Sequence, residues 1–200
     1  MRYVDDQQGR AGGVTALVAR GPKPAALVPP ARPVPRIDAI RMPKGQAKPL
    51  DAAALRALAA QGECDANPEF PKPGFYRLDA RSTLVLVPCS AGSTTYSHLA
   101  FVMRDGKAAP AGFDYPPVAE TGLPDEMRPK SPPEIVESDF GEGVLTHLVR
   151  PRYPGGCGVT QNWAWDGARF RMTILNRLGV CGKRAMWLTH YRAEPVWKTR

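Results

Sequence analysis

The sequence contains no run of about 18 apolar residues, so it predicts no membrane-spanning helix. Its three histidines lie far apart, and no Cys-x-x-Cys or His-x-His spacing occurs, which argues against a zinc site. There is no Gly-x-Ser-x-Gly nucleophile elbow, and the segment PGGCGVT is not followed by the Lys-Ser/Thr of a phosphate-binding loop. We therefore expect no catalytic residues, no metal and no cofactor.

Acidic residues are also scarce relative to basic ones. Nineteen Asp and Glu stand against 27 Lys and Arg, for a formal net charge of +8, and nine basic residues fall in the last fifty positions. Two interpretations remain open, a solvated basic face or a surface for an anionic partner. The candidate anionic-ligand contacts are Arg169, Arg171, Lys183 and Arg184.

Proline is abundant, with 22 residues, and one dense run lies near the N-terminus. The stretch PKPAALVPPARPVPR holds six prolines in fifteen residues, a composition that favours extended polyproline II over helix or sheet interior. This pattern predicts a linker over residues 21–48. It would separate a short strand, Val14 to Val18 within residues 1–20, from a β-rich domain over residues 49–200.

One segment, PLDAAALRALAAQG, predicts a short helix near residues 51–61. Asp51 is the expected N-cap, Leu50 and Leu55 the expected hydrophobic staple, and Gly62 the expected left-handed C-terminal residue. The apolar stripe of Leu55, Leu58 and Ala59 predicts packing against a core.

The remainder follows a period of two, which is typical of strands. STLVLVPC predicts a buried strand that ends at Pro88, and YSHLAFVMRDGKAAP predicts a hairpin turning at Asp105 and Gly106. EIVESDFGEGVLTHLVR predicts two short strands about a Gly-Glu-Gly turn. We therefore expect a mainly β fold of antiparallel hairpins, sandwich-like or barrel-like.

The clearest hairpin lies within residues 157–181. With Asp166 and Gly167 as the two central residues of a type I′ turn, Trp163 would lie opposite Phe170. Burial of the core face would then explain Trp163, Trp165 and Phe170 without a ligand. Arg169 and Arg171 would point into solvent on the other face.

The four cysteines form two pairs of similar spacing. Of the three possible connectivities we favour Cys64–Cys89 and Cys157–Cys181, because each pair links the ends of one locally folded unit. Disulfides persist in oxidising compartments. The cysteines therefore favour a periplasmic or secreted protein, although MRYVDDQQGR lacks the apolar segment of a signal peptide.

Several segments together are familiar: GGCGVTQNWAWDGARFRMT, GVCG, PVWKTR, LVLVPCSAG and RYVDDQQGRAGGVTALVARG. Across essentially the whole chain, the sequence resembles the bacterial six-cysteine domain-of-unknown-function family 1176. The resemblance implies a longer, exported gene product, because family members typically carry a signal peptide and two more cysteines in an N-terminal portion. The family has no established activity, so the resemblance implies a compartment and an architecture but no catalytic residues.

Reactive side chains are explained by scaffold roles. His98 and His147 are each isolated on predicted strands, and a Ser90, His98 and Asp105 triad is only an enumeration without a nucleophile elbow. The acidic cluster is best interpreted as a solvated turn; it comprises Glu134, Glu137, Asp139 and Glu142.

These observations predict a non-catalytic interaction or structural module of the bacterial cell envelope. Its expected partners are anionic envelope components. The alternative is an envelope-directed, hydrolase-like enzyme whose polar cluster assembles only in the fold. Nucleic-acid binding is opposed by the disulfides, and the sequence leaves the oligomeric state open.

Overall fold

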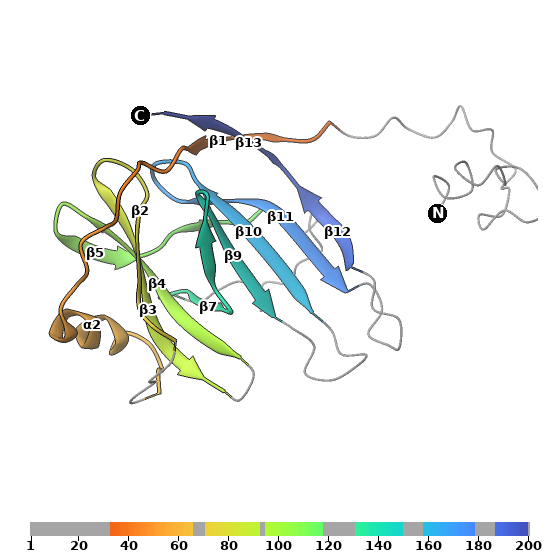
Figure 1. Cartoon of the computed structure of the whole chain (residues 1–200). Helices are drawn as coiled ribbons and strands as arrows, with labels where there is room; N and C mark the ends of the chain where they lie inside the picture. The colour runs from red at the N-terminus through yellow and green to blue at the C-terminus, as the bar shows by residue number, and fades with distance from the viewer. Residues whose placement is uncertain are drawn as a thin grey trace, which may run out of the picture. The chain divides into compact units, whose positions relative to one another are not determined.

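The computed structural model describes residues 33–65, 71–92, 95–117, 131–149, 158–178 and 187–199. Within these residues the chain is mainly β, with three open sheets and the short helix α2 (Ala52–Ala59), so the predicted fold class is confirmed. The two larger sheets face each other, as in a sandwich, rather than closing into a barrel (Figure 1).

The first large sheet has the strand order β2-β3-β4-β5, with β7 added to β4. Its strands are β2 (Gly74–Arg77), β3 (Ser82–Ala91), β4 (Tyr96–Arg104), β5 (Lys107–Pro110) and β7 (Glu134–Val136). Helix α2 lies on the outer face of this sheet (Figure 1).

The second large sheet has the order β12-β11-β10-β9-β8, with β6 added in parallel to β11. Its strands are β6 (Phe113–Asp114), β8 (Asp139–Gly141), β9 (Val144–Val149), β10 (Val159–Trp165), β11 (Phe170–Leu178) and β12 (Trp187–Arg192).

The third sheet pairs β1 (Arg36–Ile40) in parallel with the C-terminal strand β13 (Glu194–Lys198). Ala39 and Ile40 of β1 are buried, and Ile40 joins the main core. Residues 36–40 of the linker predicted over residues 21–48 therefore form a strand, because apolar residues at alternate positions bury one side of β1. All elements belong to the unit from Val34 to Arg200.

The main core lies between the two large sheets. Leu84 and Leu86 from the first sheet meet large side chains of the second, with Trp163, Trp165 and Phe170 at 0 to 2% exposure. Burial of these three side chains confirms the prediction for the aromatic face. A hydrogen bond adds to this contact: Trp165 Nε1 in β10 donates to Asp79 Oδ2, in the connection between β2 and β3, at 2.8 Å.

A second cluster lies under the helix. Leu58 packs on Val85, Val87 and Phe101, and Asp51 caps the helix by accepting from the Ala54 N–H at 2.8 Å. The disulfide Cys64–Cys89 belongs to this cluster and has a Cα–Cα distance of 4.4 Å, which confirms the first predicted pair. It ties the chain after α2 to β3.

The predicted register of the 157–181 hairpin is wrong. Trp165 pairs with Phe170 and Trp163 with Met172, so the connection has four residues instead of two. Asp166 Oδ1 accepts from the N–H groups of Ala168 and Arg169, both at 2.8 Å. This side-chain turn replaces a type I′ turn, which would need positive φ at both central positions; only Gly167 has it.

The predicted alternation also breaks within β11. The register shifts between Asn162 and Trp163, so that Thr173 is the extra residue of a bulge. Met172 faces the core, as alternation predicts, but beyond the bulge Leu175 is buried in place of the predicted Ile174.

Two residues that were expected to end an element of secondary structure, Pro88 and Gly62, do not do so. Strand β3 continues through Pro88 because its neighbour β2 pairs only as far as Leu86, which leaves position 88 without a ladder partner on that side. Gly62 has no positive φ, and the C-cap is Ala60. A Cβ at Gly62 would lie 2.7 Å from Leu99 Cδ1, so close packing explains this glycine.

The turn predictions at the other hairpins hold. Asp105 and Gly106 both have positive φ, 50° and 77°, and join β4 to β5 in two residues.

The segment that begins at Glu134 forms three strands instead of the predicted two, because β7 pairs with the first sheet before the chain crosses to β8 in the second. The predicted strand Val14 to Val18 lies outside the described residues.

Candidate functional site

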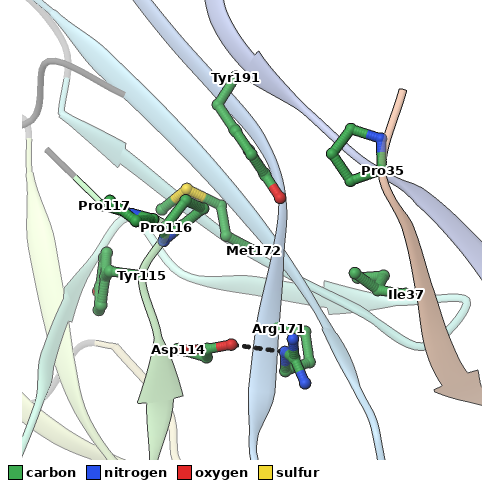
Figure 2. A pocket seen from close by; sticks show the side chains of 9 residues that line it. All are labelled: Pro35, Ile37, Asp114, Tyr115, Pro116, Pro117, Arg171, Met172 and Tyr191. Carbon is green, nitrogen blue, oxygen red and sulfur yellow. Dashed lines mark ion pairs between the residues drawn. The ribbon is translucent and has the colours of Figure 1, made fainter. Parts of the chain in front are cut away.

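A groove of about 360 Å³ opens beside strands β6 and β11 (Figure 2). It falls within the size range of about 300–1,000 Å³ that small-molecule sites occupy. Four elements or their flanking residues contribute side chains, and the lining consists of Pro35, Ile37, Asp114, Tyr115, Pro116, Pro117, Arg171, Met172 and Tyr191.

An ion pair occupies one wall of the groove. Arg171 Nε lies 2.6 Å from Asp114 Oδ2, and Arg171 Nη1 lies 3.5 Å from Asp166 Oδ2. The Arg171 and Asp114 side chains keep 35% and 37% of their surface exposed, so solvent reaches both. One guanidinium therefore lies between two carboxylates, and the local charge is negative.

The position of Asp114 follows from the packing of its neighbour. Phe113 stacks on Phe170 with ring centroids 5.3 Å apart and contacts Trp163 edge-on at 4.9 Å. These contacts hold β6 in register with β11, where Asp114 pairs with Arg171. Burial of one aromatic ring thus places the carboxylate beside the guanidinium.

Tyrosine and proline rings form the other walls. Tyr115 packs against Trp163 at 5.9 Å and extends the aromatic cluster toward the groove. Figure 2 shows Tyr115 with Pro116 and Pro117 on one side of the opening, Pro35 on another, and Tyr191 above Arg171. The groove therefore combines flat apolar surfaces with one charged pair.

A second polar cluster lies between β4 and the crossing from β7 to β8. The hydroxyl of Ser138 lies 2.7 Å from His98 Nδ1, and His98 Nε2 lies 2.9 Å from the carbonyl oxygen of Lys72. With Nε2–H donating to that carbonyl, Nδ1 accepts from Ser138. Burial lowers the pKa of His98, which favours the neutral ring.

The sequence did not reveal this serine-histidine pair, because 40 residues separate its members and no motif marks them. The triad enumerated from the sequence does not assemble. Ser90 bonds to Ser97 at 2.6 Å, and Asp105 is paired with Arg81. Ser138 and His98 are 8% and 5% exposed.

His147 performs a different role. Its Nδ1 accepts from the Val136 N–H at 3.0 Å, which links strand β9 of one large sheet to β7 of the other. Burial lowers its pKa to about 4. His147 is therefore neutral at physiological pH and acts as a structural acceptor.

The predicted anionic-ligand contacts have divergent environments. Arg169 is exposed on the hairpin turn, as expected. Arg171 keeps 35% of its side-chain surface exposed but is paired with Asp114 and Asp166, so the expectation of a side chain pointing freely into solvent is only partly met. The cross-strand register with β6 brings in a carboxylate that the sequence pattern did not reveal.

Four predicted residues lie outside the described part of the chain: Cys157, Cys181, Lys183 and Arg184. The pairing of Cys157 with Cys181 stays a prediction. Within the described residues, no group of three or more His, Cys, Asp or Glu side chains is placed to hold a metal ion. Across those same ranges, no helix is both long and apolar enough to cross a membrane.

Residues 1–194 match the family described as "Protein of unknown function (DUF1176)". The chain belongs to this family. The DUF1176 chain is also 26% identical over 180 residues to a protein of Escherichia coli (strain K12) named "Uncharacterized protein YpfG". That alignment covers 85% of this chain and 50% of the relative, so the chain spans about half of the relative's length. No solved structure matches the chain.

Proposed function

We propose that this protein is a non-catalytic, extracytoplasmic binding module that contacts components of the bacterial cell envelope. The groove beside Asp114 and Arg171 carries the proposal, because it presents charged groups and aromatic rings at an accessible surface. The disulfide Cys64–Cys89 supports an oxidising compartment.

Contact with anionic envelope material would depend on Arg169 more than on Arg171. Arg169 is exposed, whereas two carboxylates offset the charge of Arg171. Attraction from an exposed arginine acts over a screening length of about 8–10 Å and fades with salt. This role for Arg169, together with Lys183 and Arg184, is the electrostatic part of the proposal.

Co-sedimentation of the oxidised protein with purified envelope material tests the proposal. The materials are peptidoglycan sacculi, lipopolysaccharide, and anionic and neutral vesicles, each at low and moderate salt. We expect binding to at least one of them, with Arg169→Ala weakening only the salt-sensitive component. Failure to bind any of the four at low salt would refute the binding role.

The serine-histidine pair makes a hydrolase the second candidate. A serine hydroxyl that donates to a neutral imidazole is the arrangement of an activated nucleophile. Both side chains are buried, which opposes access. Stoichiometric labelling of Ser138 by a fluorophosphonate probe in the native protein, abolished by His98→Ala, would favour the hydrolase and refute the non-catalytic binding module.

A further inference from the structure

We infer that the groove binds a neutral saccharide, whose hydroxyl groups bridge Asp114 and Arg171 while its ring lies against the tyrosine and proline walls. This inference rests on the proposed binding function and names its ligand class. It concerns the lining of the groove, and it is independent of the exposed arginine on the hairpin turn.

The hydrogen-bonding capacity of the ion pair is only partly used. A guanidinium has five N–H donors, and the two ion pairs of Arg171 engage its Nε and Nη1. Asp114 is joined to Arg171 through Oδ2, and among the described residues Oδ1 has no further bond. Donors and an acceptor therefore lie side by side on an accessible wall. A hydroxyl both donates and accepts, so adjacent hydroxyls satisfy both groups.

The charge around the groove favours a neutral ligand over an anion. Arg171 contributes one positive charge, whereas Asp114 and Asp166 contribute two negative charges within 3.5 Å of it. An anion placed beside Arg171 would also approach both carboxylates and be repelled. A polyol avoids this cost and still forms charge-assisted hydrogen bonds.

The apolar walls complement a saccharide ring. Tyr115, Tyr191 and the three prolines present flat surfaces around the charged pair (Figure 2). The C–H face of a pyranose buries apolar area against such rings, and its polar edge reaches the ion pair. Sites of this kind combine apolar walls with a few placed polar groups.

A proline-rich peptide is a poorer fit. Proline residues have no N–H, so such a peptide offers few donors to Asp114 Oδ1. The carboxylate would lose water without replacement, which costs free energy. Saccharide hydroxyls supply the missing donors.

The first measurement follows the wild-type protein by methyl NMR during titration with cellotetraose, maltotetraose or N-acetylchitotetraose. We expect at least one of them to shift the methyl signals of Ile37 and Met172, which line the groove. Met103 should not respond, because it belongs to the separate cluster under α2. The inference fails if none of the three shifts Ile37 and Met172, or if Met103 shifts equally.

The second measurement compares affinities by calorimetry. Asp114→Asn and Arg171→Lys should each lower the affinity for the saccharide by about tenfold or more, because each removes a charge-assisted hydrogen bond. Asp38→Asn is the matched control, since Asp38 also forms a 2.6 Å ion pair across parallel strands, with Lys198, but does not line the groove. Equal effects of all three variants would overturn the inference. Should Asp114→Asn unfold, Arg171→Lys and the wild-type titration decide.

Competing ligands separate this inference from the proposed function. Inorganic phosphate and a peptide of sequence PPARPVPR are titrated in the same way. If either of these ligands shifts Ile37 and Met172 and no saccharide does, the inference of a saccharide ligand is overturned, whereas the proposed envelope-binding module stands. Failure to co-sediment with any of the envelope materials, by contrast, would refute the binding module itself.

Discussion

The protonation of His98 and His147 is set mainly by burial, and hydrogen bonds hold both rings, two at His98 and one at His147. His98 donates to a backbone carbonyl and accepts from Ser138, and His147 accepts from the backbone of Val136. Both pKa values are lowered, because burial penalises the charged ring. Both side chains therefore stabilise the protein in the neutral form.

This arrangement predicts a loss of stability in mild acid. The pKa of His147 is about 4 in the folded protein against 6.5 as its ordinary value. As the pH falls through this window, the unfolded chain binds a proton that the folded chain does not, so the free energy of unfolding decreases. The loss from His147 is on the order of 3 kcal/mol, and His98 adds in the same direction.

Chemical unfolding at several pH values checks this prediction. His147→Gln should flatten the curve between pH 6.5 and 4, the ordinary and folded pKa values. Asp79 and Asp105 have lowered pKa values, so their stabilising effect is lost only below their ordinary value of 3.8. An unchanged slope in His147→Gln would contradict the assignment.

At the scale of elements, the helix depends on the sheet beneath it. Helix α2 has only eight residues, which is short for independent stability. Leu58 is 7% exposed and packs on β3 and β4, and Gly62 permits close approach to Leu99. The disulfide fixes the end of this unit.

Removing the disulfide should destabilise the protein without changing its fold. Closing a loop with a sequence separation of 25 contributes about 3 kcal/mol through the unfolded state. Guanidinium unfolding of the Cys64→Ala/Cys89→Ala variant measures this loss.

The Cys157→Ala/Cys181→Ala variant is the control, because it removes the other two cysteines and leaves Cys64 and Cys89 in place. Mass spectrometry of its non-reduced digest should still show Cys64 joined to Cys89. A free Cys64 or Cys89 in oxidised protein would contradict the structure.

At the scale of the whole molecule, the two ends of the compact unit meet. Strand β1 begins at Arg36 and pairs along its length with β13, which ends at Lys198. Arg36 also forms an ion pair with Glu194 at 3.4 Å, although both side chains are largely exposed, so burial of Ile37, Ala39 and Ile40 contributes more.

The domain boundary is therefore expected at residue 34 instead of 49. A fragment of residues 34–200 should therefore be more stable than one of residues 49–200. A fragment of residues 49–200 lacks β1, leaves β13 unpaired and loses the burial of two isoleucines, each worth roughly 1.5–3 kcal/mol. Equal stability of the two fragments, measured by urea unfolding, would restore the predicted boundary.

Local chemistry was sufficient for the features that neighbouring residues decide. Asp51 caps α2 because its side chain reaches the N–H three residues on, and Asp105-Gly106 turns because both adopt positive φ. Alternation over a few residues predicted the burial of Trp163, Trp165 and Phe170. The spacing of Cys64 and Cys89 predicted their disulfide.

The tertiary structure alone decided what depends on strands distant in sequence. Arg171 was expected in solvent, but β6 brings Asp114 to it from 57 positions earlier in the chain and turns an exposed arginine into one wall of a groove. Ser138 meets His98, and β1 meets β13, through pairings that carry no local signal. The physical reason is that strand pairing is set by burial of complementary faces across the whole molecule, whereas turns and caps are set by bonds within a few residues.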